Sequence, residues 1–191
     1  NTNDMDIWIV EKEEGQWGTP HPLPGKINST SDDYFPSVSE KGTLYFASSR
    51  GTGRGDIFRS QLVNGLYQEP ESLSDINTPF AESNPFIAPD ESFLIFMAAR
   101  PEGFGGYDLY ISYNEKGKWT TPLNLGPSIN TEVNDFQPSI SPDGKWVAFM
   151  SDRDGFWRLY YVSIDGGPVH FLSDISGQPL SWLEHTIQWV E

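Results

Sequence analysis

The chain has 191 residues, with 27 Asp and Glu against 12 Lys and Arg, which gives a formal net charge of −15. Phosphate backbones and anionic lipid surfaces would repel such a chain, so nucleic acid is excluded as an expected partner. No apolar run approaches the roughly 18 residues of a membrane span, so membrane insertion is not expected. The absence of cysteine removes disulfides and thiolate ligands.

The first 33 residues read as two short strands rather than as a full unit. Residues 6–10, DIWIV, share their pattern with residues 56–60 and 108–112, which we interpret as the third strand of a repeated unit. A Gly-x-aromatic triplet then follows at residues 15–17, 65–67 and 117–119, and we expect it to open the fourth strand.

The repeated unit is clearest in residues 35–60, 84–112 and 136–162. Each has an anchoring proline near its start, Pro36, Pro85 or Pro138, and continues through strand, turn, strand, turn and strand. A period of roughly 40–50 residues with four strands in each unit is typical of a β-propeller.

Residues 141–155, SPDGKWVAFMSDRDG, resemble the Pro-Asp-Gly repeat of TolB-type, WD-like propellers of bacterial envelope proteins. The resemblance covers nearly the whole chain. It implies a β-propeller that docks a protein partner, with a periplasmic or extracellular location.

We therefore predict an all-β chain that folds as one domain over residues 1–191, a propeller of four blades with four antiparallel strands each. The expected blades are residues 34–83, 84–135, 136–178, and 179–191 together with 1–33. Residues 186–190 should pair with residues 7–10, so that strands from both termini share one blade and close the ring.

Two classes of loop converge on one face of such a propeller, those between blades and those joining second to third strands, and loop faces carry binding sites. Residues that recur in every unit are expected to hold the blades together: Arg50, Arg100, Arg153, Asn28, Asn77 and Asn130. The predicted partner-binding residues are acids and aromatics of that face: Asp33, Glu82, Phe104, Tyr107, Asp135, Phe156 and Trp157. Phe80 is a further aromatic that breaks the repeat.

No catalytic or metal-binding set is predicted. The acids occupy repeat positions, so no carboxylate pair is singled out for acid–base work. The turn at residues 103–106 has no following helix to cradle phosphate. We expect no cofactor, although a cation could sit at the channel mouth.

The resulting functional hypothesis is a non-catalytic binding module, not an enzyme, with a protein partner. Two alternatives stay open: a carbohydrate-binding or glycoside-hydrolysing propeller, and a structural oligomerising domain. The sequence leaves the oligomeric state undetermined.

Overall fold

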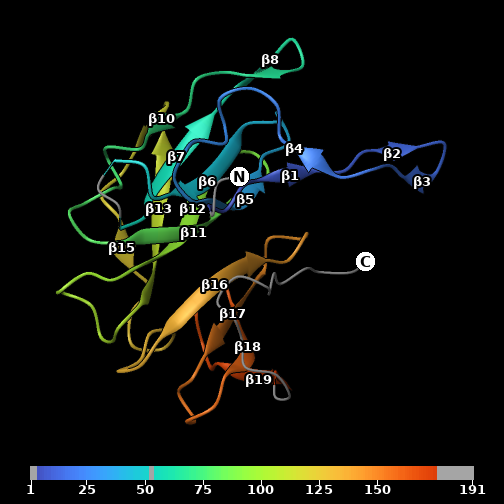
Figure 1. Ribbon diagram of the computed structural model, residues 1–191. Coiled ribbons are helices and arrows are strands. Elements are labelled where there is room, and N and C mark those ends of the chain that lie inside the picture. The colour runs from blue at the N-terminus through green and yellow to red at the C-terminus, as the bar shows by residue number, and fades with distance from the viewer. Residues whose placement is uncertain (1–3, 52–53, 176–191) are drawn as a thin grey trace.

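The computed structural model describes residues 4–51 and 54–175, and these residues form strands without a helix (Figure 1). No helix long and apolar enough to cross a membrane occurs among them. The all-β prediction is thus confirmed for the described part of the chain.

Three antiparallel sheets, two of four strands and one of five, follow one another along the chain. Sheet 1 has the order β10-β7-β6-β5 and consists of β5 (Asp33–Val38), β6 (Leu44–Ser48), β7 (Asp56–Ser60) and β10 (Glu71–Ser72). Sheet 2 has five strands, β11 (Glu82–Ile87), β12 (Phe93–Ala98), β13 (Asp108–Glu115), β14 (Lys118–Trp119) and β15 (Leu123–Asn124), and both β14 and β15 pair with β13. Sheet 3 has the order β16-β17-β18-β19 and consists of β16 (Asp135–Ile140), β17 (Trp146–Ser151), β18 (Arg158–Ser163) and β19 (His170–Asp174).

A two-stranded N-terminal sheet precedes them, formed by β1 (Trp8–Ile9) and β4 (His21–Pro22). β1 and β4 correspond to β7 and β10 of sheet 1. The sequence of residues 1–33 predicts this, because it was interpreted as a third and a fourth strand. The partner proposed for it, residues 186–190, lies outside the described residues. The four-blade count and the closure of the ring therefore stay predictions.

The Gly-x-aromatic triplets do not open the fourth strands. They form the second arm of short hairpins inserted between third and fourth strands: β2 (Lys12–Glu13) with β3 (Gln16–Trp17), β8 (Leu62–Val63) with β9 (Leu66–Tyr67), and the end of β13 with β14 (Lys118–Trp119). Positive φ angles at Asn64 (52°) and Gly65 (78°) form the tight two-residue turn that such hairpins prefer. The fourth strand follows a few residues later.

The first strand of each sheet carries a β-bulge at the residue before its anchoring proline. The register shifts between Tyr34 and Ser37 in β5, with equivalent shifts in β11 and β16. Phe35, Asn84 and Gln137 all adopt a left-handed φ of 51° at this point. A bulge re-aims side chains and increases local twist, so these three residues point differently from their strand neighbours.

The hydrophobic core lies between consecutive sheets. Tyr45 and Ile57 of sheet 1 pack with Leu94, Phe96 and Tyr110 of sheet 2. The other face of sheet 2 packs on sheet 3, with Ile95, Leu109, Val147, Phe149 and Tyr160 in contact. Ile7, Leu23 and Ile27 of the N-terminal segment cover Phe46 and Phe58 of sheet 1 in the same manner. Face-to-face packing of this kind places the first strands of the sheets side by side.

Candidate functional site

The repeated arginines fasten each sheet to the loop before it. Arg100 donates from Nε to Glu82 Oε1 (3.2 Å) and from Nη2 to the carbonyl oxygen of Ile76 (2.7 Å). Its guanidinium lies 5.6 Å from the ring centre of Phe96 and 4.8 Å from that of Tyr110. A planar guanidinium suits this combination of carboxylate bonding and aromatic stacking.

The same geometry recurs in the other two sheets. Arg153 Nη2 donates to Asp135 Oδ1 (2.8 Å) and to the carbonyl of Ile129 (2.6 Å). Arg50 Nη2 donates to Asp33 Oδ1 (2.6 Å) and also to the carbonyl of Ile27. The three arginines thus occupy a repeated structural position rather than a free surface.

All three acids that were predicted to bind a partner are instead the carboxylates that pair with these arginines. The side chains of Asp33, Glu82 and Asp135 are 0% exposed. Besides its arginine, Glu82 accepts hydrogen bonds from the Thr78 backbone amide (3.0 Å) and hydroxyl (2.6 Å). The structure therefore differs from the prediction that these acids contact a partner. Their carboxylates are buried and bind the arginines and the neighbouring loops.

The repeated asparagines clamp the third strand of the preceding unit. Asn130 accepts from the Leu109 amide (2.8 Å) and donates to the Leu109 carbonyl (2.9 Å). Asn77 and Asn28 make the same pair of bonds, with Ile57 and Ile7 respectively. An amide side chain can do this because it carries both a donor and an acceptor.

The two predicted classes of loop lie against each other. The Tyr107 carbonyl accepts from the Asp135 amide (2.8 Å), and the Gly106 amide donates to the Val133 carbonyl (3.0 Å). A β-carbon at Gly105 would lie 1.9 Å from the Val133 carbonyl oxygen, so only glycine allows this approach. The glycine-rich turn is thus a packing element between loops.

The remaining predicted site residues are aromatic and differ in exposure. Phe104 is 47% exposed and Phe156 is 68% exposed, whereas Tyr107 and Trp157 are half-buried. Phe80 is 38% exposed. Trp157 meets Phe136 edge to face, with ring centres 4.8 Å apart. These residues belong to the loops that the sequence assigns to one face.

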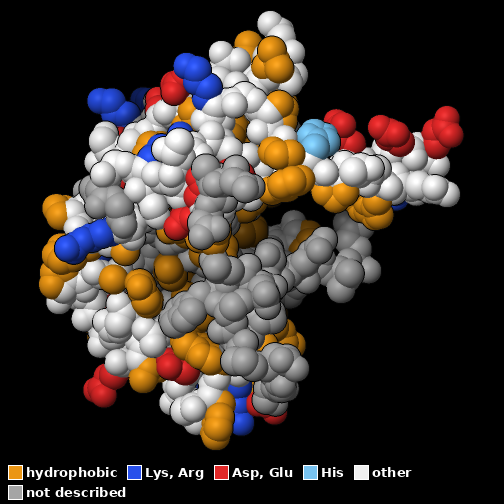
Figure 2. All heavy atoms as spheres, viewed as in Figure 1, with side chains coloured by type: hydrophobic (Ala, Val, Ile, Leu, Met, Phe, Trp, Pro, Cys, Tyr) orange, Lys and Arg blue, Asp and Glu red, His pale blue; other side chains and the backbone are white. Residues whose placement is uncertain are grey.

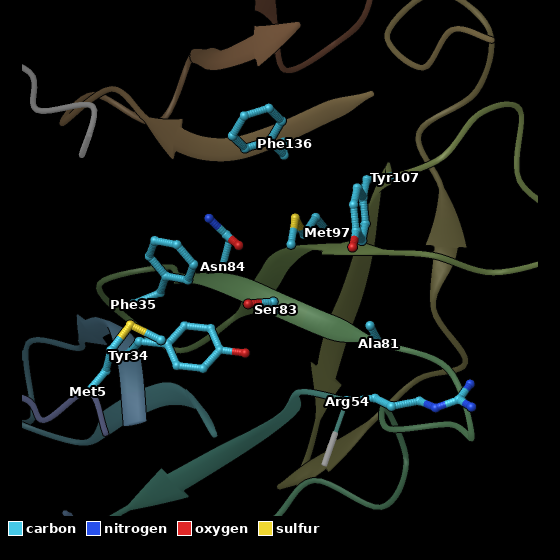
Figure 3. A pocket seen from close by; sticks show the side chains of 10 residues that line it. All are labelled: Met5, Tyr34, Phe35, Arg54, Ala81, Ser83, Asn84, Met97, Tyr107 and Phe136. Carbon is cyan, nitrogen blue, oxygen red and sulfur yellow. The ribbon is translucent and has the colours of Figure 1, made fainter. Parts of the chain in front are cut away.

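A cavity of about 240 Å³ lies where the first strands β5, β11 and β16 approach one another (Figure 3). We call it the central cavity. Its apolar wall is formed by two methionines and four aromatic residues: Met5, Tyr34, Phe35, Met97, Tyr107 and Phe136. Its polar lining includes Arg54, Ser83 and Asn84. A concave apolar site with a few polar groups is the usual form of a ligand pocket.

Tyr34 reaches across one end of the central cavity. A β-carbon at Gly55 would lie 3.0 Å from the Tyr34 hydroxyl oxygen, so glycine leaves room for the ring. Burial raises the pKa of the Tyr34 hydroxyl above its ordinary value. The hydroxyl is therefore neutral at physiological pH and available as a dipole.

Among the residues that line the central cavity, Tyr107 was predicted from the sequence as a partner-binding residue, whereas Tyr34, Phe35, Asn84 and Phe136 were not. Their signal was present beside each anchoring proline. The residue immediately before that proline is Phe35 in one unit, Asn84 in the next and Gln137 in the third. Residues that hold the sheets together keep the same amino-acid type in every unit, as the arginines do. A position whose amino acid changes from unit to unit is therefore a candidate for ligand contact.

Acidic side chains gather away from the central cavity, at the tip of the β2–β3 hairpin (Figure 2). Glu11, Glu13 and Glu14 are exposed there. Among the described residues, no group of three or more His, Cys, Asp or Glu side chains is arranged to hold a metal ion. The suggested cation at the channel mouth is not tested by these observations.

The fold is that of a β-propeller, because the solved structures that it resembles are TolB-like and other propeller proteins. The chain superposes on TolB from Acinetobacter baumannii with a TM-score of 0.59 and 19% identity, covering 90% of this chain and 41% of that one. A puromycin-hydrolyzing peptidase of Mycobacterium tuberculosis gives a TM-score of 0.57 and 16% identity, covering 87% and 29%. No family model matches the chain.

One curated relative is similar in sequence. The uncharacterized peptidase YuxL of Bacillus subtilis (strain 168) is 30% identical over 109 residues, which are 54% of this chain and 16% of that protein. The chain thus spans less than a fifth of the relative's length.

These comparisons contradict the prediction that the chain is not an enzyme. Both YuxL and the M. tuberculosis protein are described as peptidases, so repeats of this kind occur in proteins with hydrolytic activity. The absence of a distinct carboxylate pair among the repeat positions was a poor guide, because it concerned only the propeller's own carboxylates. A protein that contains a propeller can carry its reacting groups elsewhere in a longer chain.

Proposed function

We propose that this chain is the peptide-binding propeller of a longer protein and that it takes up an extended peptide or protein segment at the central cavity. The observation that carries the proposal is the aromatic lining of that cavity. Tyr34 and Phe35 from β5, Tyr107 from the loop before β13, and Phe136 from β16 surround one space. Aromatic side chains supply large contact area at low entropic cost and dominate binding energies at such sites.

The surroundings of the cavity suit a protein ligand more than a small free metabolite. Phe104 is exposed on the loop that leads to Tyr107, and it can extend the contact beyond the cavity itself. The net charge of −15 favours a ligand with basic residues and predicts binding that weakens as salt rises.

The similarity to peptidases supports a specific version of the proposal, in which the propeller presents peptides to a hydrolase. The similarity to TolB supports a second version, in which it docks a protein partner in the bacterial envelope. A periplasmic or extracellular location belongs to this second version. Both versions place the ligand at the same cavity, so one binding experiment tests their common part.

The four-blade ring is also part of the proposal. The sheet of β1 and β4 corresponds to the outer half of sheet 1, and residues 179–191 would supply its inner half. Cysteines introduced at residues 8 and 188 should then cross-link within one chain. Cross-linking only between chains, or none, would contradict closure.

The binding experiment selects peptides from a random library on the immobilised chain and measures their affinity by fluorescence anisotropy. Tyr107→Ala should raise Kd at least tenfold. The control is Trp17→Ala, which removes a larger, 70% exposed aromatic on the β2–β3 hairpin, away from β11 and β16 (Figure 1). Circular dichroism checks that both variants fold. Selected peptides that bind both variants as tightly as the parent would refute the cavity as the binding site.

A further inference from the structure

Asn84 presents an unpaired acceptor to the central cavity. The residue is only 5% exposed, and its Oδ1 atom has no hydrogen-bond partner among the described residues. Figure 3 shows its side chain pointing from β11 toward Phe136 across the cavity. Buried polar groups without a partner are rare and costly, so an acceptor held in this way suits a ligand that donates a hydrogen bond.

The backbone explains why Asn84 points there. It is the bulge residue of β11, with φ at 51° directly before Pro85. Asparagine tolerates this left-handed conformation better than most side chains. The equivalent residues are Phe35, which also lines the cavity, and Gln137, so this unit alone offers a short amide there.

The walls around this acceptor suit an aromatic ring. In Figure 3, Phe35 lies beside Asn84 and Phe136 lies above it, while Met97 and then Tyr107 follow on the side opposite Phe35. Offset and edge-to-face ring contacts are favourable beyond simple burial. An apolar cavity of roughly 150 Å³ holds benzene. The central cavity, at about 240 Å³, therefore has room for a phenol or an indole.

The charge of the lining selects among donor-bearing side chains. Arg54 is the charged residue among the described residues that line the cavity. A lysine or arginine would have to bury its charge in a lining that includes no acid among the described residues, which is costly. A neutral donor meets no such penalty, and tryptophan and tyrosine are the aromatic side chains that carry one.

We infer that the central cavity selects a tryptophan or tyrosine side chain of its peptide ligand, with the indole N–H or the phenol O–H donating to Asn84 Oδ1 between Phe35 and Phe136. This inference rests on the proposed function, since it names the side chain recognised at the same cavity. A site built to pair with a donor discriminates against a ligand that lacks it, because its own polar group is then left unpaired.

The test uses three small probes and the whole chain. The probes are N-acetyl-tryptophanamide, N-acetyl-tyrosinamide and N-acetyl-phenylalaninamide, with affinities measured by ligand-observed NMR titration. The tyrosine probe should bind about tenfold more tightly than the phenylalanine probe, the effect of one hydrogen bond to an otherwise unpaired group. The tryptophan probe should show a preference of the same order.

Two substitutions at one position isolate the acceptor. Asn84→Gly removes it and suits the left-handed backbone, so the variant should fold and bind the tyrosine and phenylalanine probes equally. Asn84→Asp keeps acceptor oxygens and should keep the preference. The matched control is Gln68→Leu, which removes an exposed amide whose Nε2 donates to the Leu66 carbonyl.

Equal binding of tyrosine and phenylalanine probes by the parent chain would overturn the inference, as would a preference that survives Asn84→Gly. Failure of all three probes to bind would overturn it too. A different result contradicts the proposed function: library-selected peptides that bind the Tyr107→Ala variant with the same Kd as the parent chain. Peptides that bind at the cavity without preferring a tryptophan or tyrosine side chain would contradict this inference but not the proposed function.

Discussion

Replacing Arg100 with methionine tests how the sheets are held to their loops. The side chain is 7% exposed, and its partner Glu82 is 0% exposed. Methionine fills most of the same space between Phe96 and Tyr110 but leaves the Glu82 carboxylate without its cation. Removing one partner of a buried ion pair costs about 3–5 kcal/mol. The two hydrogen bonds from Thr78 still stabilise Glu82, so we expect the lower end of that range, about 3 kcal/mol.

The assay is urea denaturation at neutral pH, followed by tryptophan fluorescence. Lys26→Met is the control, since Lys26 and Glu69 form an ion pair whose side chains are 75% and 66% exposed. An exposed pair of this kind contributes little to stability, because solvent screens it. The double variant Arg100→Met with Glu82→Gln removes the stranded charge and should recover part of the loss.

Arg50 and Arg153 are more exposed than Arg100, with side chains 20% and 17% accessible. Their replacement by methionine should therefore cost less, because water can partly solvate the carboxylate left behind. The reasoning is refuted if Arg100→Met unfolds at the same urea concentration as Lys26→Met. It is also refuted if the double variant is less stable than Arg100→Met alone.

Three further predictions concern the framework. Gly105→Ala places a β-carbon 1.9 Å from the Val133 carbonyl oxygen, so its thermal melting point should fall clearly below that of Gly117→Ala, where nothing lies within 4 Å and only the left-handed φ of 89° disfavours alanine; equal melting points would contradict the close approach. Asn130→Ala leaves the buried amide and carbonyl of Leu109 unpaired and should cost about 2–3 kcal/mol in urea denaturation; a loss below 1 kcal/mol would argue against the clamp. Burial raises the pKa of Tyr45 from 10.0 to about 12, so the unfolding free energy should be level below pH 10 and fall between pH 10 and 12. Tyr45→Phe should make that alkaline decline shallower, and an unchanged decline would show that Tyr45 is not its source.

The framework was readable from the sequence because its residues recur at fixed spacing. Arg50, Arg100 and Arg153 signalled a repeated contact, and the asparagines signalled a second one. The residue types also indicated the partners. A guanidinium donates hydrogen bonds to carboxylates and carbonyls, and a side-chain amide can both donate to a backbone carbonyl and accept from a backbone amide.

The binding residues were harder to read because their placement depends on three-dimensional details. The buried state of Asp33, Glu82 and Asp135 follows from the loop that folds over each acid, whereas their place on the predicted loop face suggested exposure. The direction of Phe35 and Asn84 depends on a bulge before proline, a position where the sequence suggests ordinary extended backbone.

The extra hairpins were misread for a similar reason. A Gly-x-aromatic triplet fits either a new strand or the second arm of a tight turn, and the pairing of β8 with β9 decides between them. The fourth strand β10 has only two residues, Glu71 and Ser72, both exposed. It therefore carries no hydrophobic alternation that a sequence reading could detect.

The central claim is that peptides bind at the cavity enclosed by the first strands and the loop before β13. The most direct measurement is photo-crosslinking of a library-selected peptide to chains that carry benzoylphenylalanine in place of either Phe104 or Trp17. Both positions are exposed, at 47% and 70%. Residue 104 lies on the loop that leads to Tyr107 of the cavity lining, whereas residue 17 lies in β3, away from β11 and β16 (Figure 1). The proposal predicts a crosslinked product from position 104 and none from position 17. Crosslinking from position 17 alone would contradict it.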